Sequence, residues 1–294
     1  MDEREKLARI RLIQTRHIGP MTFSLLIQRY ESALAALAAI PDLAARGGRK
    51  LSIASLADAK AELAANDDAG ARLIWRDSDS YPLRLAQFDD APVTLSTRGN
   101  LHLLHKPMIA LVGARNASIN AIRHAETLAR ELGEAGYVIV SGMARGIDAA
   151  AHRGAMATGT VGVIAGGIDI IYPPKNRALF QQIVDEGLLL AEMRPGTAPT
   201  PRHFPTRNRI IASLALGVVV IEAAAKSGSL ITAREAGERG SEVMAIPGSP
   251  LDPRSNGCNQ LIRDGATLVQ NAADIIDAVD QHRTVEIPLK NNMD

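Results

Sequence analysis

Three arginines and a serine–glycine turn lie close together in the sequence and could bind phosphate. An apolar run at residues 217–221 is preceded by Arg202, Arg207 and Arg209 and followed by Ser227-Gly228-Ser229. The run predicts a buried parallel strand, and Ser229 is a candidate N-cap of the following helix. Backbone N–H groups at a helix start bind anions, and guanidinium groups donate paired hydrogen bonds to phosphate. Glycine- and serine-rich turns also occur in α/β folds for steric reasons alone, so both interpretations stay open.

The same stretch carries a local excess of positive charge. Residues 196–240 contain six basic residues (Arg202, Arg207, Arg209, Lys226, Arg234 and Arg239) and three acidic ones (Glu222, Glu235 and Glu238). The net charge of the whole 294-residue chain is only +1, so the excess is local. A basic excess at a candidate anion site favours a partner that carries phosphate.

Composition sets broad limits on the class of protein. Hydrophobic residues make up 46% and charged residues 22% of the chain, which predicts a globular protein of about two domains. The single cysteine, Cys258, excludes an intramolecular disulfide and a cysteine-based metal cluster. The charged start is unlike a signal peptide, and no apolar run reaches the length of a membrane span. We therefore expect a cytoplasmic protein without membrane contact.

Two regions differ in their periodicity. Residues 1–66 predict a small all-helical domain, and residues 67–283 predict an α/β domain followed by a tail at 284–294 without periodicity. Ile18-Gly19-Pro20 separates two predicted helices, with Thr22 a candidate cap of the second. This outline fits a helix-hairpin-helix that contacts DNA phosphates, but a plain turn in a helical bundle is the simpler interpretation.

Short apolar runs alternate with amphipathic stretches after residue 107. The predicted strands are 108–112, 137–141, 161–165, 188–191, 217–221, 243–246 and 267–269, with helices such as 119–135 and 147–158 between them. This alternation predicts a doubly wound, mostly parallel sheet, with 93–97 as an extra strand at its edge. Ligands bind at the carboxyl ends of the strands in such sheets.

Glycine and basic residues follow several of these strands. Since parallel strands end at one edge of the sheet, we expect these residues to form a common phosphate-binding rim. The residues assigned to DNA binding are Gly113, Arg115, Arg145, Gly166, Gly167, Lys175, Asn176, Phe204, Arg207, Asn208, Arg209, Ser227, Gly228 and Ser229.

Residues with catalytic potential are few. Asp148 and His152 are four apart and could form an acid–base pair or a metal pair, but a structural hydrogen bond explains them more simply. Cys258 lacks an obvious activating histidine and fits a small packed residue, and Asp169 could order the neighbouring loop as easily as contact a sugar. Familiar catalytic motifs and the G-x-G-x-x-G fingerprint are absent from the sequence. We expect no catalytic residue, no metal and no cofactor.

Long motifs in the sequence closely resemble those of the DprA (Smf) family of DNA-processing proteins. The motifs are SGMARGID (141–148), GGIDIIYPPKN (166–176), FPTRNRIIASLA (204–215) and VVVIEAAAKSGSLITA (218–233), and the likeness runs from about residue 81 to 265. The resemblance implies a Rossmann-like core, a SAM-like helical N-terminus and a homodimer formed through roughly 230–275. It also implies a non-catalytic protein that protects single-stranded DNA and loads RecA onto it, with Arg115 and Lys175 in the DNA pocket.

Two other classes of function compete with this one. A nucleotide-hydrolysing enzyme of the lysine-decarboxylase-like group could use Glu222 and Glu235, although its P-G-G-x-G-T-x-x-E motif is replaced here by AAAKSGSLITAREA. A protein-interaction scaffold would leave the basic rim without an explanation. Since aromatic residues make up only 3% of the chain, we expect DNA binding dominated by phosphates, with Phe204 as a possible stacking residue.

Overall fold

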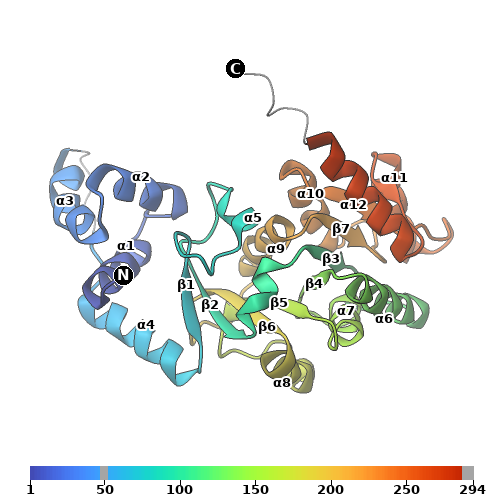
Figure 1. Ribbon diagram of the computed structural model, residues 1–294, viewed down its shortest axis with the longest axis horizontal. Helices are drawn as coiled ribbons and strands as arrows, with labels where there is room; N and C mark the ends of the chain where they lie inside the picture. Colours follow the sequence, from blue (N-terminus) through green and yellow to red (C-terminus); the bar gives the residue numbers. More distant parts are fainter. Residues whose placement is uncertain (47–51, 287–294) are drawn as a thin grey trace.

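A nine-stranded sheet forms the centre of the computed structural model, which describes residues 1–46 and 52–286 (Figure 1). The strand order is β1-β2-β6-β5-β4-β3-β7-β8-β9. The strands are β1 (Arg72–Trp75), β2 (Thr94–Gly99), β3 (Met108–Val112), β4 (Val138–Gly142), β5 (Thr160–Gly167), β6 (Leu188–Met193), β7 (Gly217–Val220), β8 (Glu242–Ala245) and β9 (Thr267–Leu268). All neighbouring pairs from β6 to β9 are parallel, whereas β2 pairs antiparallel with both β1 and β6. The predicted mostly parallel sheet is confirmed.

The seven strands predicted after residue 107 are all present, with ends shifted by at most two residues. Their continuous apolar runs follow from burial on both faces of the sheet. In β3, for example, Met108 and Ala110 belong to the core on one face, and Ile109 and Leu111 belong to the core on the other. The strand predicted at 93–97 is β2, but it does not lie at the edge, because β1 pairs along its outer side.

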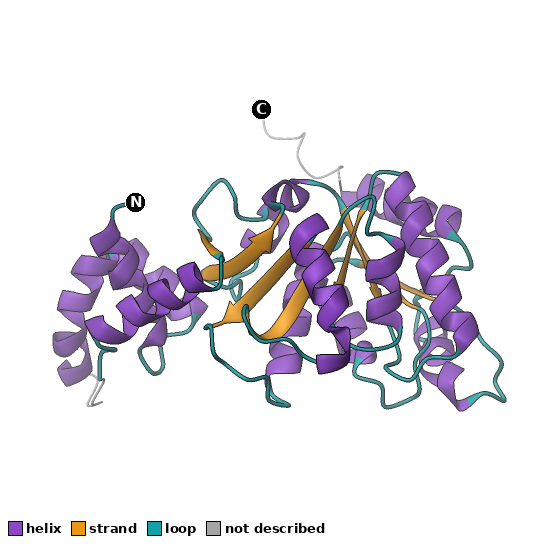
Figure 2. Cartoon of the chain, turned by 90° about the horizontal axis from the view of Figure 1, so that it is seen from below, coloured by secondary structure: helices purple, strands orange, loops and turns teal. Residues whose placement is uncertain are grey.

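Helices cover both faces of the sheet, as Figure 2 shows. The helices of this region are α5 (Leu83–Ala86), α6 (Ile119–Glu134), α7 (Ile147–Gly154), α8 (Arg177–Glu186), α9 (His203–Leu214), α10 (Ser229–Glu238), α11 (Asn256–Arg263) and α12 (Ala272–Glu286), with short 3-10 helices η1 (Leu101–His105), η2 (Pro174–Asn176) and η3 (Pro253–Ser255). The core under α9, α10 and α11 is separated by the sheet from the core under α6, α7 and α12. This is the predicted doubly wound, Rossmann-like arrangement.

Four helices at the N-terminus gather at one end of the molecule (Figure 1). They are α1 (Glu3–Gln14), α2 (Pro20–Tyr30), α3 (Ala33–Arg46) and α4 (Leu56–Asp68). Their apolar core includes Trp75 and Val93, so the helices pack on the β1 end of the sheet. At the end of α4, the Asn66 side-chain oxygen accepts a hydrogen bond from Ser96 Oγ at 2.7 Å. The division of the chain at residues 66 and 67 stays a prediction.

Both ends of the chain differ in detail from the prediction. Helix α2 begins at Pro20 with Gly19 as N-cap, so the assignment of Thr22 as the cap was wrong. Proline at the first helical position already has a helical φ and needs no hydrogen-bond partner for its nitrogen. Helix α12 continues to Glu286, beyond the predicted start of the tail at residue 284. The remainder of that predicted tail, 287–294, lies outside the described residues.

Among the described residues, no helix on its own has both the length and the apolar composition of a membrane span. The segments Pro20–Tyr30 and Ala33–Leu43, bent by 103°, reach those limits only when they are taken together.

Candidate nucleic-acid interface

Two adjoining hollows lie at the carboxyl ends of the central strands. We call the first the aromatic hollow; it has a volume of about 300 Å³ and is lined by Tyr172, Phe204, Arg115, Arg145, Lys175 and Arg207, among others. We call the second the serine hollow; it has a volume of about 550 Å³ and is lined by Gly113, Asn208, Ser227, Gly228, Ser229 and Thr232, among others. Arg115, Ala144, Phe204 and Arg207 line both. Most of the residues predicted to form the rim therefore line two hollows with a shared wall.

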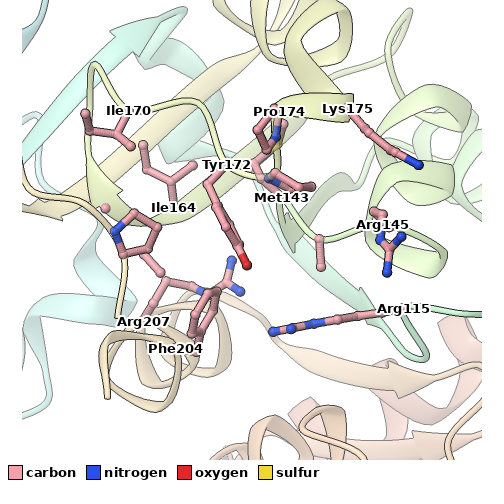
Figure 3. Close-up of a pocket in the computed structure, with 15 residues that line it drawn as sticks. Arg115, Met143, Arg145, Ile164, Ile170, Tyr172, Pro174, Lys175, Phe204 and Arg207 are labelled. Atoms are coloured by element: carbon pink, nitrogen blue, oxygen red, sulfur yellow. The ribbon is translucent and has the colours of Figure 1, made fainter. Parts of the chain in front are cut away.

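Arg115 and Phe204 belong to that shared wall, and Tyr172 lies beside Phe204 in the aromatic hollow (Figure 3). The Arg115 guanidinium carbon lies 5.0 Å from the centroid of the Phe204 ring. The Phe204 and Tyr172 rings are 5.8 Å apart and inclined by 54°. Stacking on a ring holds the exposed guanidinium in place without using its hydrogen-bond donors, which stay available to a phosphate. The sequence predicted Arg115 and Phe204 but missed Tyr172, although Tyr172 precedes Lys175 in the same loop.

Arg145 and Lys175 are both exposed at the mouth of the aromatic hollow. Arg145 Nη2 donates to the Asn116 side-chain oxygen at 3.4 Å. Asn176 does not line either hollow; its side-chain nitrogen donates to the carbonyl oxygens of Met143 and Ala144 at 2.9 and 3.3 Å. Asn176 therefore positions the loop that carries Arg145.

The two neighbouring glycines at the end of β5 have different positions. Gly166 lines the aromatic hollow, where a Cβ atom would lie 2.9 Å from the Thr197 carbonyl oxygen. Gly167 lines neither hollow and packs against the Arg194 backbone. The loop around Arg194 is ordered by Asp169, whose carboxylate accepts from Gly196 N–H at 2.8 Å, and this is one of the two roles that the sequence left open.

Arg207 lies beneath the aromatic hollow instead of on its exposed rim. Its side chain is buried, Nη1 donates to the Val163 carbonyl oxygen, and Nε donates to the Asn208 side-chain oxygen at 3.1 Å. Burial lowers the pKa of Arg207, and the nearby Asp148 carboxylate opposes that shift. Burial raises the pKa of Asp148, and Arg207 opposes that shift in turn. Arg207, which the sequence assigned to phosphate binding, is therefore a buried residue whose side chain lines the hollow.

Arg209 does not belong to the interface predicted for it. It forms an ion pair with Glu192, and its Nε lies 3.9 Å from Asp90 Oδ2. It lines neither hollow. Because successive helical residues are about 100° apart, two residues along α9 place Arg209 on the side opposite to Arg207.

The turn at Ser227 to Ser229 differs from the expected phosphate-binding site. Gly228 is the N-cap of α10 and Ser229 is its first residue, so the prediction of Ser229 as N-cap was wrong. The Ser227 and Ser229 hydroxyls lie 2.8 Å apart, and Ser227 N–H donates to the Ala224 carbonyl oxygen. Leu230 N–H donates to the Ser227 carbonyl oxygen, so much of the donor capacity of this turn is used within it. The turn lines the serine hollow but offers an anion few backbone donors.

His152 has a structural position under the interface. Its Nε2 lies 2.7 Å from the Gly142 carbonyl oxygen and its Nδ1 lies 2.6 Å from Thr160 Oγ1. Since a carbonyl oxygen only accepts, the hydrogen bond to Gly142 places the hydrogen of the neutral ring on Nε2, and the Thr160 hydroxyl also lies 3.0 Å from the Ile139 carbonyl oxygen. The structural interpretation of His152 is supported, although its partners are Thr160 and Gly142 and not Asp148.

The buried imidazole leads to a pH dependence of stability. Burial lowers the pKa of His152 to about 4, whereas an unfolded chain has an ordinary histidine pKa of about 6.5. The neutral His152 therefore makes its full contribution to the free energy of unfolding above pH 6.5. That contribution is lost as the pH falls from 6.5 towards 4, because the unfolded chain gains a proton that the folded chain does not. We expect the free energy of unfolding to fall by about 2 kcal/mol between pH 7.5 and pH 5 through this residue. Urea unfolding of the wild type and of His152→Gln measures it; equal pH dependences would contradict the prediction.

A metal site would need several coordinating side chains close together in the described part of the chain. No group of three or more His, Cys, Asp or Glu side chains lies close enough together to hold a metal among those residues. Cys258 is buried, as predicted, and burial raises the pKa of its thiol to about 12.

Comparison with sequence families gives matches over most of the chain. Residues 72–280 match the family described as DNA recombination-mediator protein A, and residues 3–65 match the DprA-like N-terminal HHH domain. The DNA processing protein DprA of Streptococcus pneumoniae is 48% identical over 200 residues, which cover 67% of this chain and 71% of that protein. DprA of Bacillus subtilis is 43% identical over 218 residues, which cover 73% of each chain.

Solved structures agree with the sequence matches. The crystal structure of S. pneumoniae DprA matches with a TM-score of 0.68 at 44% identity, covering 70% of this chain and 74% of that one. A structure of DNA processing protein A from Helicobacter pylori matches with a TM-score of 0.66 at 30% identity. That structure was solved to give insight into the single-stranded DNA binding mode of the H. pylori protein. That match covers 72% of this chain and 98% of the H. pylori chain. From its sequence motifs to its nine-stranded fold, this chain belongs to the DNA recombination-mediator protein A (DprA) family.

Proposed function

We propose that this chain binds single-stranded DNA across the aromatic and serine hollows. The observation that carries the proposal is the exposed Arg115 guanidinium, which is stacked on Phe204 and borders both hollows. Arg115, Arg145 and Lys175 would contact successive phosphates, and a base would stack on Phe204. The single-stranded DNA binding mode described for the H. pylori relative supports this assignment.

The shape of the interface favours a single strand over a duplex. The aromatic hollow, about 300 Å³ in volume, lies between ring walls and is closed at its base by the buried Arg207. A base of a duplex can enter such a space only after its base pair has opened, and this opening costs free energy. In a single strand the base is already unpaired, so this cost is absent. Duplex DNA is therefore the poorer ligand.

The wider role that we propose follows from the family. We propose a non-catalytic cytoplasmic homodimer that protects incoming DNA and loads RecA onto it during natural transformation and recombination. The relatives' descriptions as DNA processing and recombination-mediator proteins support this role. RecA-dependent ATP hydrolysis on single strands should begin sooner when the protein is present, and sedimentation at micromolar concentration should show a dimer. An unchanged lag would refute RecA loading, and a monomer would refute the homodimer.

A nucleotide-hydrolysing enzyme is the alternative function. Its two candidate carboxylates already have partners: Glu222 Oε1 accepts from Ser118 N–H at 3.0 Å, and Glu235 Oε2 lies 3.0 Å from Arg239 Nη2. Neither carboxylate lines the two hollows. Release of free base from nucleoside monophosphates during incubation with the protein would favour this alternative.

Fluorescence anisotropy tests the DNA-binding proposal directly. A labelled oligo-dT strand and a duplex of the same length are titrated with the protein over a series of salt concentrations. We expect tight binding of the strand, weaker binding of the duplex, and affinity that falls steeply with salt. Absence of binding to either DNA at low salt would refute the proposal.

The salt series also tests the contribution of Lys175. The Lys175→Ala variant should reduce the slope of log K against log salt by about 0.7, the value for one phosphate contact on a single strand. Lys106→Ala is the matched control, because Lys106 is exposed just before β3, at the amino ends of the parallel strands. Equal slopes of log K against log salt for the two variants would show that Lys175 makes no phosphate contact.

A further inference from the structure

The guanidinium of the buried Arg207 faces the aromatic hollow (Figure 3). The residue is 8% exposed, and its Nη1 and Nε already donate to the Val163 carbonyl oxygen and to Asn208. The hydrogen bonds that Arg207 forms among the described residues use Nε and Nη1 and none uses Nη2, and the side chain lines the hollow. Figure 3 shows the guanidinium pointing into the space between Tyr172, Phe204 and Arg115.

The surroundings of Arg207 fix the direction of that free donor. A Cβ atom at position 142 would collide with Arg207 Nη1 and Asp148 Oδ2, so glycine there lets both groups pack against the backbone of β4. Two hydrogen bonds and the neighbouring Asp148 carboxylate hold the planar group in one orientation. A donor held in this way can discriminate between ligands, because it cannot turn to suit a different partner.

The walls of the hollow fit the flat face of a nucleobase. Ile164, Pro199, Tyr172 and Phe204 supply apolar and aromatic surface, and the basic residues Arg145 and Lys175 lie exposed at the mouth. A base stacked on Phe204 with its phosphate at the mouth would direct its hydrogen-bonding edge towards the base of the hollow. The edge would meet Nη2, which can donate but cannot accept.

We propose that Arg207 Nη2 selects bases that carry a keto oxygen, thymine and guanine, over bases that carry an amino group at the same position. Thymine O4 and guanine O6 accept hydrogen bonds, whereas the amino groups of cytosine and adenine donate and would face a second donor. The inference rests on the proposed binding of single-stranded DNA and adds a base preference to it. Phosphate contacts still supply most of the affinity, so the preference acts on the one nucleotide that enters the hollow.

A strand with one base isolates this preference from base stacking within the strand. Wild-type protein is titrated with abasic oligonucleotides that carry a single central thymine, cytosine or difluorotoluene, and with a fully abasic strand. Difluorotoluene has the shape of thymine without its hydrogen-bonding oxygens. We expect thymine to bind roughly tenfold tighter than either of the other two bases, the effect of one hydrogen bond to a charged donor.

The outcomes separate this inference from the function on which it rests. Equal affinities for thymine, cytosine and difluorotoluene, all above that of the abasic strand, would overturn the base preference and leave DNA binding intact. Failure to bind an all-thymine strand would overturn both. The Arg207→Lys variant should lose the thymine preference while it keeps its affinity for the abasic strand; should it not fold, the wild-type series decides alone.

Discussion

Arg115→Glu should weaken the binding of an oligo-dT strand about a hundredfold at low salt. The variant loses a phosphate contact and places a negative charge beside the remaining phosphates. It also removes the guanidinium that lies 5.0 Å from the Phe204 ring centroid. Because Arg115 borders both hollows, the substitution acts on the whole proposed path of the strand. Anisotropy titration at two salt concentrations measures the effect, and the loss should shrink as salt screens the repulsion.

Arg29→Glu is the matched control for this prediction. Arg29 is also an exposed arginine whose guanidinium carbon lies near an aromatic ring, 5.5 Å from the centroid of Tyr30 in helix α2. It therefore reports what charge reversal alone does to a DNA-binding protein of this size. Equal losses for Arg29→Glu and Arg115→Glu would place the interface elsewhere.

Arg207→Leu should lower the free energy of unfolding by about 4 kcal/mol at pH 8. Removing one partner of a buried pair leaves the other charge without compensation, which typically costs about 3–5 kcal/mol. Here the remaining group is the buried Asp148, and the Val163 carbonyl oxygen also loses its donor. Arg153→Leu is the control, because the Arg153–Glu126 ion pair is half-exposed and should contribute less than about 1 kcal/mol.

A second substitution and a change of pH identify the cause of that loss. Adding Asp148→Asn to Arg207→Leu removes the uncompensated charge and should restore a large part of the stability. Arg207 is the main charge that lowers the pKa of Asp148, so this pKa rises further in Arg207→Leu. When folding raises the pKa of a carboxyl group, the free energy of unfolding of the protein falls as the pH rises. The loss of stability caused by Arg207→Leu should therefore grow from pH 5 to pH 8. Urea unfolding measures both effects; a cost independent of pH and of residue 148 would point to lost packing alone.

The sequence predicted the sheet because its strands are short, apolar and buried on both faces. Burial on both faces favours apolar side chains along β3 to β7, where Ser141 and Thr160 are buried polar exceptions, and such runs are visible without a structure. The position of β2 was not visible in the same way. Its pairing with β1 depends on where residues 72–75 pack against the sheet, and the local sequence of β2 does not determine that position.

Residues on loops were easier to assign than residues on helix α9. Arg115, Arg145 and Lys175 follow the ends of strands, so the parallel topology alone brings them to one edge. Arg207 and Arg209 are both arginines of the same short motif, and their types give no reason to separate them. The rotation of α9 against the sheet decides that one reaches the aromatic hollow and the other pairs with Glu192.

The sequence by itself determined the parallel α/β fold, the rim of glycine and basic residues, and the family resemblance, since these depend on residue types and order along the chain. Only the tertiary structure decided which polar groups remain available to a ligand. It showed that Asn176 supports a loop, that the turn at Ser227 uses its own donors, and that the Arg207 tip reaches the hollow. Whether a donor is free depends on every neighbour that could accept from it, and those neighbours come from distant parts of the chain.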